Sequence, residues 1–438
     1  MELDPDLKLA IAVTCAWRIW ARLLGSVGSV GFVGFVAVTA CGPGSADETA
    51  TESGSTSGPT SGSTGAPTTG EEPPPALDCE VVPTVLDAPQ SVSEPAEFSS
   101  DVVAGLDGDA VLLTYDALIK YSAGAPVWSH AYEAGERAQA LASLPDGRVV
   151  AGGYATGDET AVLLMLVGAD GQRLATRTHD LAPGLVEQAL AIAVTPGGDV
   201  FAAVLASTPD EPKTPSVLRL DRYDAALGHV WSVGVDGVGF QPGLAVDGDG
   251  NTYLGTISIA STEEFEYTWS LGVMAFDPAG EPRWTADALE FRTWKELAAV
   301  DISVGDQVYV LANNASGFAL RALSTAGAPA WEIVRGVADG GEHVLRAAAA
   351  SPCGGVFVGG RSDVEIDLIS ERASLFHIAA DGTLGAITTV LDTPHEGEYE
   401  YDVTTTLAVS PLGRVIAAGR LRPAAGGDGD DLPWLHAY

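Results

Sequence analysis

The feature that most constrains this chain is a unit of four predicted β-strands that recurs along most of its length. The clearest copy spans residues 245–284. An apolar strand leads into a polar turn at 247–251, and further strands follow at 252–259, at 271–276 and from Trp284. Turns that carry Gly and Asp supply the positive φ that tight hairpins need. The unit therefore predicts one four-stranded antiparallel sheet for each repeat.

Two landmarks recur with this unit. The turn between the first and second strands reads LDGD at 106–109, PDGR at 145–148, PGGD at 196–199, GDGN at 248–251, VGD at 304–306, CGG at 353–355 and LGR at 412–414. A tryptophan follows the turn between the third and fourth strands in four copies, at Trp128, Trp231, Trp284 and Trp331. Large apolar rings at one repeated position predict packing of each repeat against the next.

Four-stranded repeats with a period of roughly 40–60 residues are typical of β-propellers. We therefore predict an all-β, seven-bladed β-propeller over residues 79–438. Residues 244–257, followed by VMAFDPAGEPRW at 273–284, resemble bacterial β-propeller repeats of the SBBP and delta-60 kind, and more loosely pyrroloquinoline-quinone-like repeats. The quinone-type repeat carries Thr before its turn Gly, where this chain has Ala123, Ala279 and Ala326. The resemblance thus implies a fold, and we expect no cofactor.

Charge excludes one class of partner. The chain carries 59 Asp and Glu against 22 Lys and Arg, for a formal net charge of −37. Nucleic-acid binding needs a basic surface, so we expect no nucleic-acid partner. Like-charged surfaces repel one another and keep a protein soluble, and we expect a monomer.

The N-terminus has the composition of an export signal. Two arginines, Arg18 and Arg22, precede an apolar run at 23–40 that ends in small residues before Cys41. The sequence VTAC at 38–41 resembles the bacterial lipobox, which implies a signal peptide at 1–40, lipidation of Cys41 and a membrane anchor. Gly42 in place of Asp favours the outer membrane. The alternative is an uncleaved transmembrane anchor, because the run is about long enough to span a bilayer.

Residues 41–78 form a Ser-, Thr-, Gly- and Pro-rich stretch with few apolar side chains, and we predict a disordered linker. Beyond it, Cys79 and Cys353 are the cysteines left once Cys15 and Cys41 are accounted for, and export favours a disulfide between them. Two unrelated thiols are the alternative. The last repeat lacks a fourth strand, and we predict that residues 80–86 supply it.

A candidate ligand-binding surface lies in two long connections, at 261–269 and 287–296. In a propeller, the connections between second and third strands emerge on the same side as those that link one blade to the next. The two segments should be neighbours, and together they hold aromatic residues beside carboxylates: Phe265, Tyr267, Trp269, Phe291 and Trp294. Such surfaces stack sugars or bind basic peptides. The alternative is that the rings only pack the connections against the blades.

The sequence carries no recognisable reaction chemistry. The seven His residues are scattered, no zinc-ligand spacing occurs, and the DGDGN turn at 247–251 lacks the later residues of a calcium loop. We therefore name no catalytic and no metal-binding residue. The leading hypothesis is a non-enzymatic binding module at the cell envelope, with a protein, peptide or carbohydrate ligand. The alternatives are a hydrolase or lyase with its site at the central channel, and an envelope-assembly scaffold.

Overall fold

A computed structural model describes the part of the chain discussed below. The chain divides into two units, Met1–Ala76 and Leu77–Tyr438, and every described residue belongs to the second. The described residues are 90–91 and 101–437 without 106–108, 123–124, 158–159, 209–216, 236–237, 264–265, 287–289, 294–296, 315–316, 337–342, 364–370, 390–398, 412 and 424–431. Within these ranges, no helix is both long and apolar enough to cross a membrane. The expected signal peptide and linker lie outside the described residues.

The described chain is all β, as predicted. The first sheet contains β2 (Asp101–Ala104), β3 (Ala110–Leu113), β4 (Ala117–Ser122) and β5 (Ala125–Ala131). The second contains β6 (Glu136–Ser143), β7 (Val149–Thr156), β8 (Thr160–Val167) and β9 (Arg173–His179). The third contains β10 (Val186–Val194), β11 (Val200–Ser207), β12 (Val217–Tyr223) and β13 (His229–Val235). Each is antiparallel with its strands in chain order.

The fourth sheet contains β14 (Val238–Val246), β15 (Thr252–Glu263), β16 (Glu266–Phe276) and β17 (Pro282–Ala286), with β18 (Glu290–Thr293) also paired to β16. The fifth contains β19 (Leu297–Val304), β20 (Val308–Asn314), β21 (Gly317–Leu323) and β22 (Pro329–Gly336). The sixth joins eight strands: β23 (His343–Ala350), β24 (Val356–Asp363), β25 (Glu371–Ile378), β26 (Leu384–Thr389), β27 (Tyr399–Val409), β28 (Val415–Pro423), β29 (Leu432–Ala437) and β1 (Gln90–Ser91).

The expectation of seven separate blades is wrong, because the described strands form six sheets. The last two repeats are continuous: β25 and β27 pair in parallel, with Glu371 opposite Tyr401. This single parallel bridge merges strands that the repeat pattern assigns to two blades. A bridge between two antiparallel groups leaves no periodic signal in sequence, since parallel partners need no hairpin turn.

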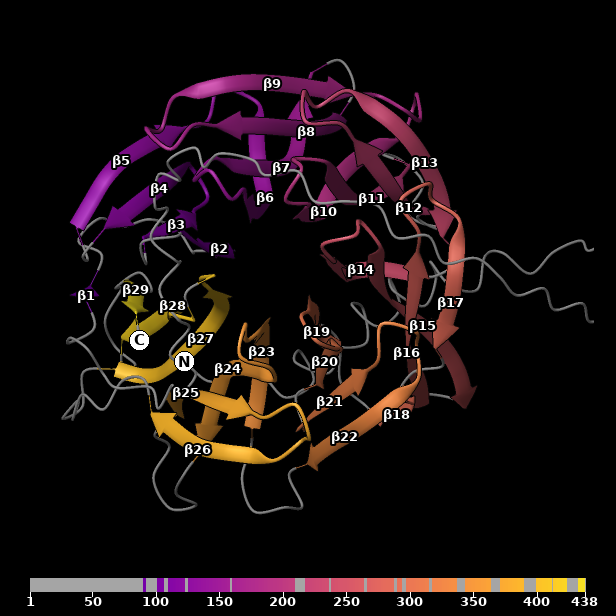
Figure 1. The fold of residues 1–438 in the computed structure, drawn as a ribbon, viewed down its shortest axis with the longest axis vertical. Helices are drawn as coiled ribbons and strands as arrows, with labels where there is room; N and C mark the ends of the chain where they lie inside the picture. Colours follow the sequence, from indigo (N-terminus) through magenta and orange to yellow (C-terminus); the bar gives the residue numbers. More distant parts are fainter. Residues whose placement is uncertain are drawn as a thin grey trace, which may run out of the picture. The chain divides into compact units, whose positions relative to one another are not determined.

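The sheets follow one another around a ring of inner strands (Figure 1). The first strand of each repeat lies innermost and contacts the next inner strand, in the order β2, β6, β10, β14, β19, β23 and β27, and β27 contacts β2 again. The sixth sheet contributes two of these inner strands. The protein is therefore a β-propeller, and each described sheet brings at least one inner strand to the centre.

The core lies between sheets rather than within one. Apolar clusters fill the space between each pair of neighbours; the one between the fourth and fifth sheets, for example, joins Tyr253, Leu271 and Val273 to Val308 and Val310. Since both faces of each sheet are buried against neighbours, the central strands read as continuous apolar runs, such as VFAAV at 200–204.

The repeated tryptophans bind one sheet to the next, as predicted. Trp284 on β17 donates its Nε1–H to the Thr325 carbonyl oxygen in the fifth sheet, at 3.0 Å. Its ring also covers Gly327, where an added Cβ would lie 2.7 Å from the Trp284 Cδ2 atom. The same bond and ring contact recur at Trp128 with Gly171, Trp231 with Gly280 and Trp331 with Gly382. We call this arrangement the tryptophan latch.

The interface between the second and third sheets replaces this latch. The strand register places Ala175 where the latch has its Trp, and Leu227 occupies the turn position of the latch Gly. Leu227 is fully buried and has a positive φ of 63°, which is unfavourable for a residue with a Cβ. The Leu227 side chain in the turn of the third sheet thus fills the space that the small Ala175 side chain leaves on the strand of the second sheet.

A strand from the N-terminal side pairs with the last strand of the chain. Gln90 and Ser91 of β1 pair antiparallel with Leu435 and Trp434 of β29. The predicted segment, 80–86, lies outside the described residues. A fourth strand from residues 80–86 therefore stays a prediction, and the described partner of β29 is the two-residue β1. A strand of two residues shows no alternation, so its position could not be read from the sequence.

Candidate functional site

Two carboxylates lie on the inner strands. Asp101 on β2 and Asp301 on β19 occupy the same register position, three residues before the end of their strands. The Asp101 Oδ2 atom accepts the Leu141 N–H of β6, and the Asp301 Oδ2 atom accepts the Ala348 N–H of β23, each at 2.8 Å. Each carboxylate therefore satisfies a donor on the next inner strand, and thereby ties neighbouring sheets together at the centre.

Asp101 also contacts the sheet on its other side. The Thr406 hydroxyl of β27 donates to the Asp101 Oδ1 atom at 3.3 Å, and the Val102 N–H donates to the same oxygen at 2.8 Å. One carboxylate thus contacts the first, second and last inner strands. Thr406 itself stands at the register position of the two aspartates. This position is therefore polar in three of the inner strands, and the ring closes through two of them.

These carboxylates hold protons more tightly than exposed ones do. Burial raises the pKa of Asp101 to about 6, against the lowering effect of its hydrogen bonds. Burial raises the pKa of Asp301 to about 7, and the negative charge of Asp101 raises it further. Groups that titrate near neutrality can give and take protons at physiological pH, which general acid–base catalysis requires. The same groups also serve as structural links, so their chemistry alone does not define an enzyme.

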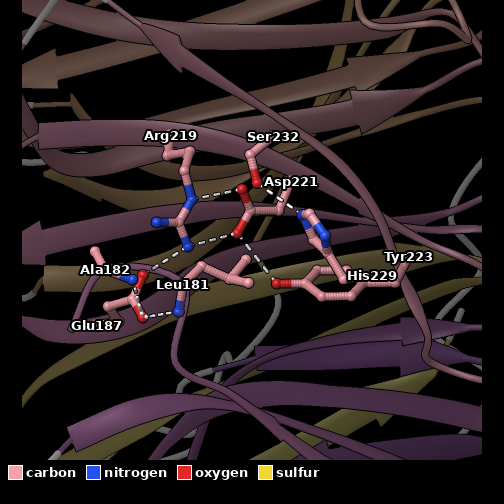
Figure 2. A network of polar contacts seen from close by, with 8 residues as sticks. All are labelled: Leu181, Ala182, Glu187, Arg219, Asp221, Tyr223, His229 and Ser232. Atoms are coloured by element: carbon pink, nitrogen blue, oxygen red, sulfur yellow. Dashed lines mark hydrogen bonds and ion pairs between the residues drawn. The ribbon is translucent and has the colours of Figure 1, made fainter.

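A second polar cluster lies in the third sheet (Figure 2). The Arg219 guanidinium of β12 contacts two carboxylates: its Nη2 atom lies 2.6 Å from the Glu187 Oε1 atom, and its Nε atom lies 2.6 Å from the Asp221 Oδ1 atom. Both carboxylates are fully buried. Burial lowers the pKa of Arg219, but the hydrogen bonds and charge of Asp221, with those of Glu187, outweigh it and raise the pKa. Arg219 therefore stays charged between its two carboxylate partners.

This cluster orders its surroundings. The Glu187 Oε2 atom accepts the N–H groups of Leu181 and Ala182, in the link from the second sheet to the third, at 2.8 and 3.3 Å. The Tyr223 hydroxyl donates to the Asp221 Oδ2 atom at 3.1 Å. The contacts of the cluster fix a connecting segment and a buried tyrosine. We assign the cluster a positioning role at the interface that lacks the tryptophan latch.

Two histidines lie beside this cluster. The His179 Nε2–H donates to the Leu227 carbonyl oxygen at 3.0 Å, at the turn where other interfaces have the latch. The His179 ring lies 4.8 Å from the Tyr223 ring, and burial lowers the pKa of His179. His229 contacts the Ser232 hydroxyl at 2.8 Å. The His179 imidazole therefore completes the contact between the second and third sheets.

Neither polar group was predicted from the sequence. Arg219, Asp221 and Tyr223 alternate along VLRLDRY, which places them on one face of β12. That alternation was a usable signal, because the face packs against the apolar cluster between the second and third sheets. Asp101 and Asp301 each precede apolar residues in short strands, and nothing local distinguishes them from solvent-facing aspartates.

The predicted aromatic site is brought together in part. β16 pairs with β18, so that Trp269 stands opposite Phe291 and Tyr267 opposite Thr293. The neighbourhood of the two segments is therefore confirmed, although they form strands where loops were expected. Residues directly opposite one another share a face of a sheet, as do residues two apart on one strand. Tyr267, Trp269 and Phe291 thus share one face, while Phe265 and Trp294 lie outside the described residues.

The remaining sequence predictions concern cysteines and metals. Cys353 lies in the turn between β23 and β24, and its N–H donates to the Ser351 hydroxyl at 3.2 Å. Cys41 and Cys79 lie outside the described residues, so lipidation and the disulfide stay predictions. The side chain of Asp247 accepts the Asp249 and Asn251 N–H groups and the Tyr253 hydroxyl, so the calcium-like segment is a hairpin turn, as we judged. Among the described residues, no group of three or more potential metal ligands occurs.

Comparison with known proteins identifies the fold alone. The chain matches no protein-family model and no curated protein sequence. Among solved structures, it is similar to a chain of the mitotic checkpoint complex, at 12% identity and a TM-score of 0.46, over 81% of this chain and 91% of that one. It is also similar to the β-propeller domain of the Trilobed protease from Pyrococcus furiosus, at 10% identity and a TM-score of 0.45, over 78% and 95%.

A third similar structure is the Synechocystis apocarotenoid oxygenase, at 14% identity and a TM-score of 0.44, over 67% of this chain and 71% of that one. Matches thus include enzymes and propellers of other kinds. At these identities they carry no argument about what this protein does, since one fold serves many functions. The class that the fold defines is the β-propeller.

Proposed function

We propose that this protein is an exported, lipid-anchored β-propeller that binds a partner at the cell envelope and catalyses no reaction. The observation that supports binding is the extension of the fourth sheet. β15 and β16 have 12 and 11 residues, longer than the second and third strands of the neighbouring third and fifth sheets. β17 pairs with the second half of β16 from Val273, and β18 pairs with the first half, up to Ser270.

This extension forms a small three-stranded platform of its own. Ile259, Trp269 and Phe291 stand opposite one another across β15, β16 and β18. This extra pairing goes beyond the four strands that the other complete repeats contribute to their sheets. Aromatic residues are enriched where proteins bind partners. The platform is therefore the part of the described chain that best fits a recognition surface.

The test of binding uses the platform directly. A photo-crosslinking residue at position 269 should capture a discrete partner from envelope extract, and the same residue at Val230, exposed on the outer strand β13, should not. Replacing both Trp269 and Phe291 with Ala should reduce capture by at least about tenfold, as at interface hot spots. Equal capture from positions 269 and 230 contradicts the proposed surface.

The envelope location rests on the N-terminal sequence. A diacylglycerol thioether and an N-acyl chain on Cys41 would bury many methylenes, each worth about 0.8 kcal/mol, and so give a stable anchor. Mass spectrometry of the mature protein should find a lipidated N-terminal Cys41. An intact 23–40 segment, or an unmodified Cys41, contradicts the anchor and leaves the binding proposal standing.

The second candidate is an enzyme with its site at the centre of the ring. The observation that favours it is the pair of inner-strand carboxylates, Asp101 and Asp301, whose pKa values lie near neutrality. If the protein turns over a substrate, Asn at either position should lower kcat at least about a hundredfold, the usual contribution of a general acid or base. Retention of full activity by both variants excludes this site.

A further inference from the structure

The turn between β3 and β4 presents an exposed tyrosine beside a guanidinium from the second sheet. The Arg137 Cζ atom of β6 lies 3.3 Å from the centre of the Tyr115 ring, and 43% of Tyr115 is exposed. The strand register places Tyr154 of β7 directly opposite Arg137. Asp116, next to Tyr115, is also exposed. Two neighbouring sheets thus bring two phenols, one guanidinium and one carboxylate to one surface.

The Tyr115 turn is ordered by neighbouring groups. The buried Thr114 hydroxyl donates to the Ala117 carbonyl oxygen at 2.9 Å and accepts the Ala117 N–H at 3.1 Å. The Tyr132 N–H donates to the Asp116 carbonyl oxygen at 3.1 Å, from the link between the first and second sheets. A turn fixed before binding saves the entropy of ordering it afterwards. Tyr115 and Asp116 are therefore presented in a single arrangement.

The guanidinium keeps donors for a ligand. Stacking on a ring uses the flat face of a guanidinium and leaves its in-plane N–H groups free to bind. The nearest acidic neighbours on the chain, Glu133 and Glu136, are committed to Arg173 at 3.0 and 2.7 Å. Among the described residues, no ion pair involves Arg137. A hydrogen bond with the Tyr115 side chain engages one N–H of Arg137 and raises its pKa, as does the charge of Asp116, so Arg137 stays charged and keeps its other N–H groups for a ligand.

This combination selects the chemical class of the ligand. A cation would be repelled by Arg137, and an anion by Asp116 and by the formal net charge of −37. A neutral molecule with adjacent hydroxyls meets an acceptor in Asp116 and donors in Arg137. An apolar C–H face on the same molecule can cover the exposed part of the Tyr115 ring. Saccharides combine these two features.

We propose that Tyr115, Asp116, Arg137 and Tyr154 form a binding site for a neutral saccharide. This site lies on the first and second sheets and is separate from the platform on the fourth sheet. The proposal specifies a ligand class that the proposed function leaves open. By topology, it lies on the same side of the ring as the platform, since both occur at connections between second and third strands. Failure of one does not imply failure of the other.

The test measures binding of defined oligosaccharides to the folded propeller. Isothermal titration with neutral cello-, malto-, xylo- and chito-oligosaccharides should detect at least one ligand. Uronic-acid oligosaccharides form the anionic arm and should bind more weakly. Tyr115→Ala should weaken the neutral ligand by about tenfold, the value of one stacked aromatic, whereas Tyr115→Phe should stay within about threefold. Arg137→Ala and Asp116→Asn should each weaken it as well.

The matched control is Arg177→Ala, because Arg177 lies exposed on β9 and donates to the Thr176 carbonyl oxygen. It should bind like the native protein. Unfolding curves of all variants should coincide. If Arg137→Ala does not fold, Arg137→Lys replaces it: this variant keeps the charge but loses the planar, forked guanidinium, and it should also bind the neutral ligand more weakly. The proposal is overturned if no neutral oligosaccharide binds, if acidic ones bind more tightly, or if Tyr115→Ala binds as well as Arg177→Ala.

Discussion

Replacing Asp301 with Asn should stabilise the propeller at neutral and alkaline pH. The pKa of Asp301 rises from 3.8 to about 7 on folding, mainly through burial. A group with a raised pKa stabilises the folded state below its unfolded pKa, and this contribution is lost as pH rises through the folded pKa. The folded protein should therefore lose stability between about pH 4 and pH 7 through this one group.

The magnitude follows from the shift. Three units correspond to roughly 4 kcal/mol at most, since one unit is worth 1.36 kcal/mol. Asn keeps an oxygen that accepts the Ala348 N–H and adds no charge, so it resembles the protonated acid. At pH 8 the variant should exceed the native protein by a few kcal/mol of unfolding free energy, and near pH 4 the two should agree.

The assay is urea unfolding at a series of pH values. Asp249→Asn, in an exposed turn, is the matched control and should change stability by no more than about 0.5 kcal/mol at any pH. Asp101→Asn adds a second check, because it removes the charge that raises the pKa of Asp301. The double variant should therefore gain less than the sum of the singles. A native-minus-variant difference that does not change with pH, or a less stable variant at pH 8, refutes the reasoning.

Further predictions concern the interfaces and the ring closure. Gly327→Ala should destabilise by more than about 1 kcal/mol, because the position has a φ of 86° and its new methyl meets Trp284; a thermal melt like that of the native protein contradicts this. Arg219→Met should cost about 3–5 kcal/mol in urea unfolding by leaving two buried carboxylates unpaired, and a neutral result would mean that they are protonated. Deleting residues 79–91 should lower the melting temperature by removing the strand that pairs with β29, whereas deleting 60–72 should leave it unchanged. Peptide mapping without reductant should join Cys79 to Cys353, and reduction should then cost roughly 2–5 kcal/mol; recovery of both as separate thiols excludes the bond.

Much of the fold could be predicted because its signals are local. The Gly-bearing turns recur with positive φ where the sequence placed them, at Gly147, Gly198, Gly250 and Gly413. The repeated tryptophans also gave a local signal, because each packs its ring against the next sheet from the same position of its repeat. The predicted number of separate sheets was wrong because Glu371 and Tyr401 pair in parallel and so join two repeats into one sheet. No hairpin turn connects these two residues, so the sequence gives no local signal for their pairing.

The candidate sites were less accessible to sequence reasoning. The platform was found because its aromatic residues cluster along the chain, and its strand pairing needed the structure. Asp101 and Asp301 are 200 positions apart, so their electrostatic coupling follows from closure of the ring. The Tyr115 and Arg137 pair likewise joins two sheets through a contact that no periodicity encodes. Contacts between residues of different sheets cannot be predicted from one sequence when the residue types involved, such as Asp, Tyr and Arg, are common throughout the chain.

The tryptophan latch also sets an order of assembly. Each latch bonds a strand to a turn 41 to 49 residues further along the chain, never to an earlier one. Synthesis runs from the N-terminus, so the outermost strand of each latched sheet stays unsecured until the following repeat has been made. The pairing of β1 with β29 forms only after the last strand, β29, has been made. Until the following repeat has been made, a latch tryptophan lacks both its carbonyl acceptor and its glycine contact in the next sheet.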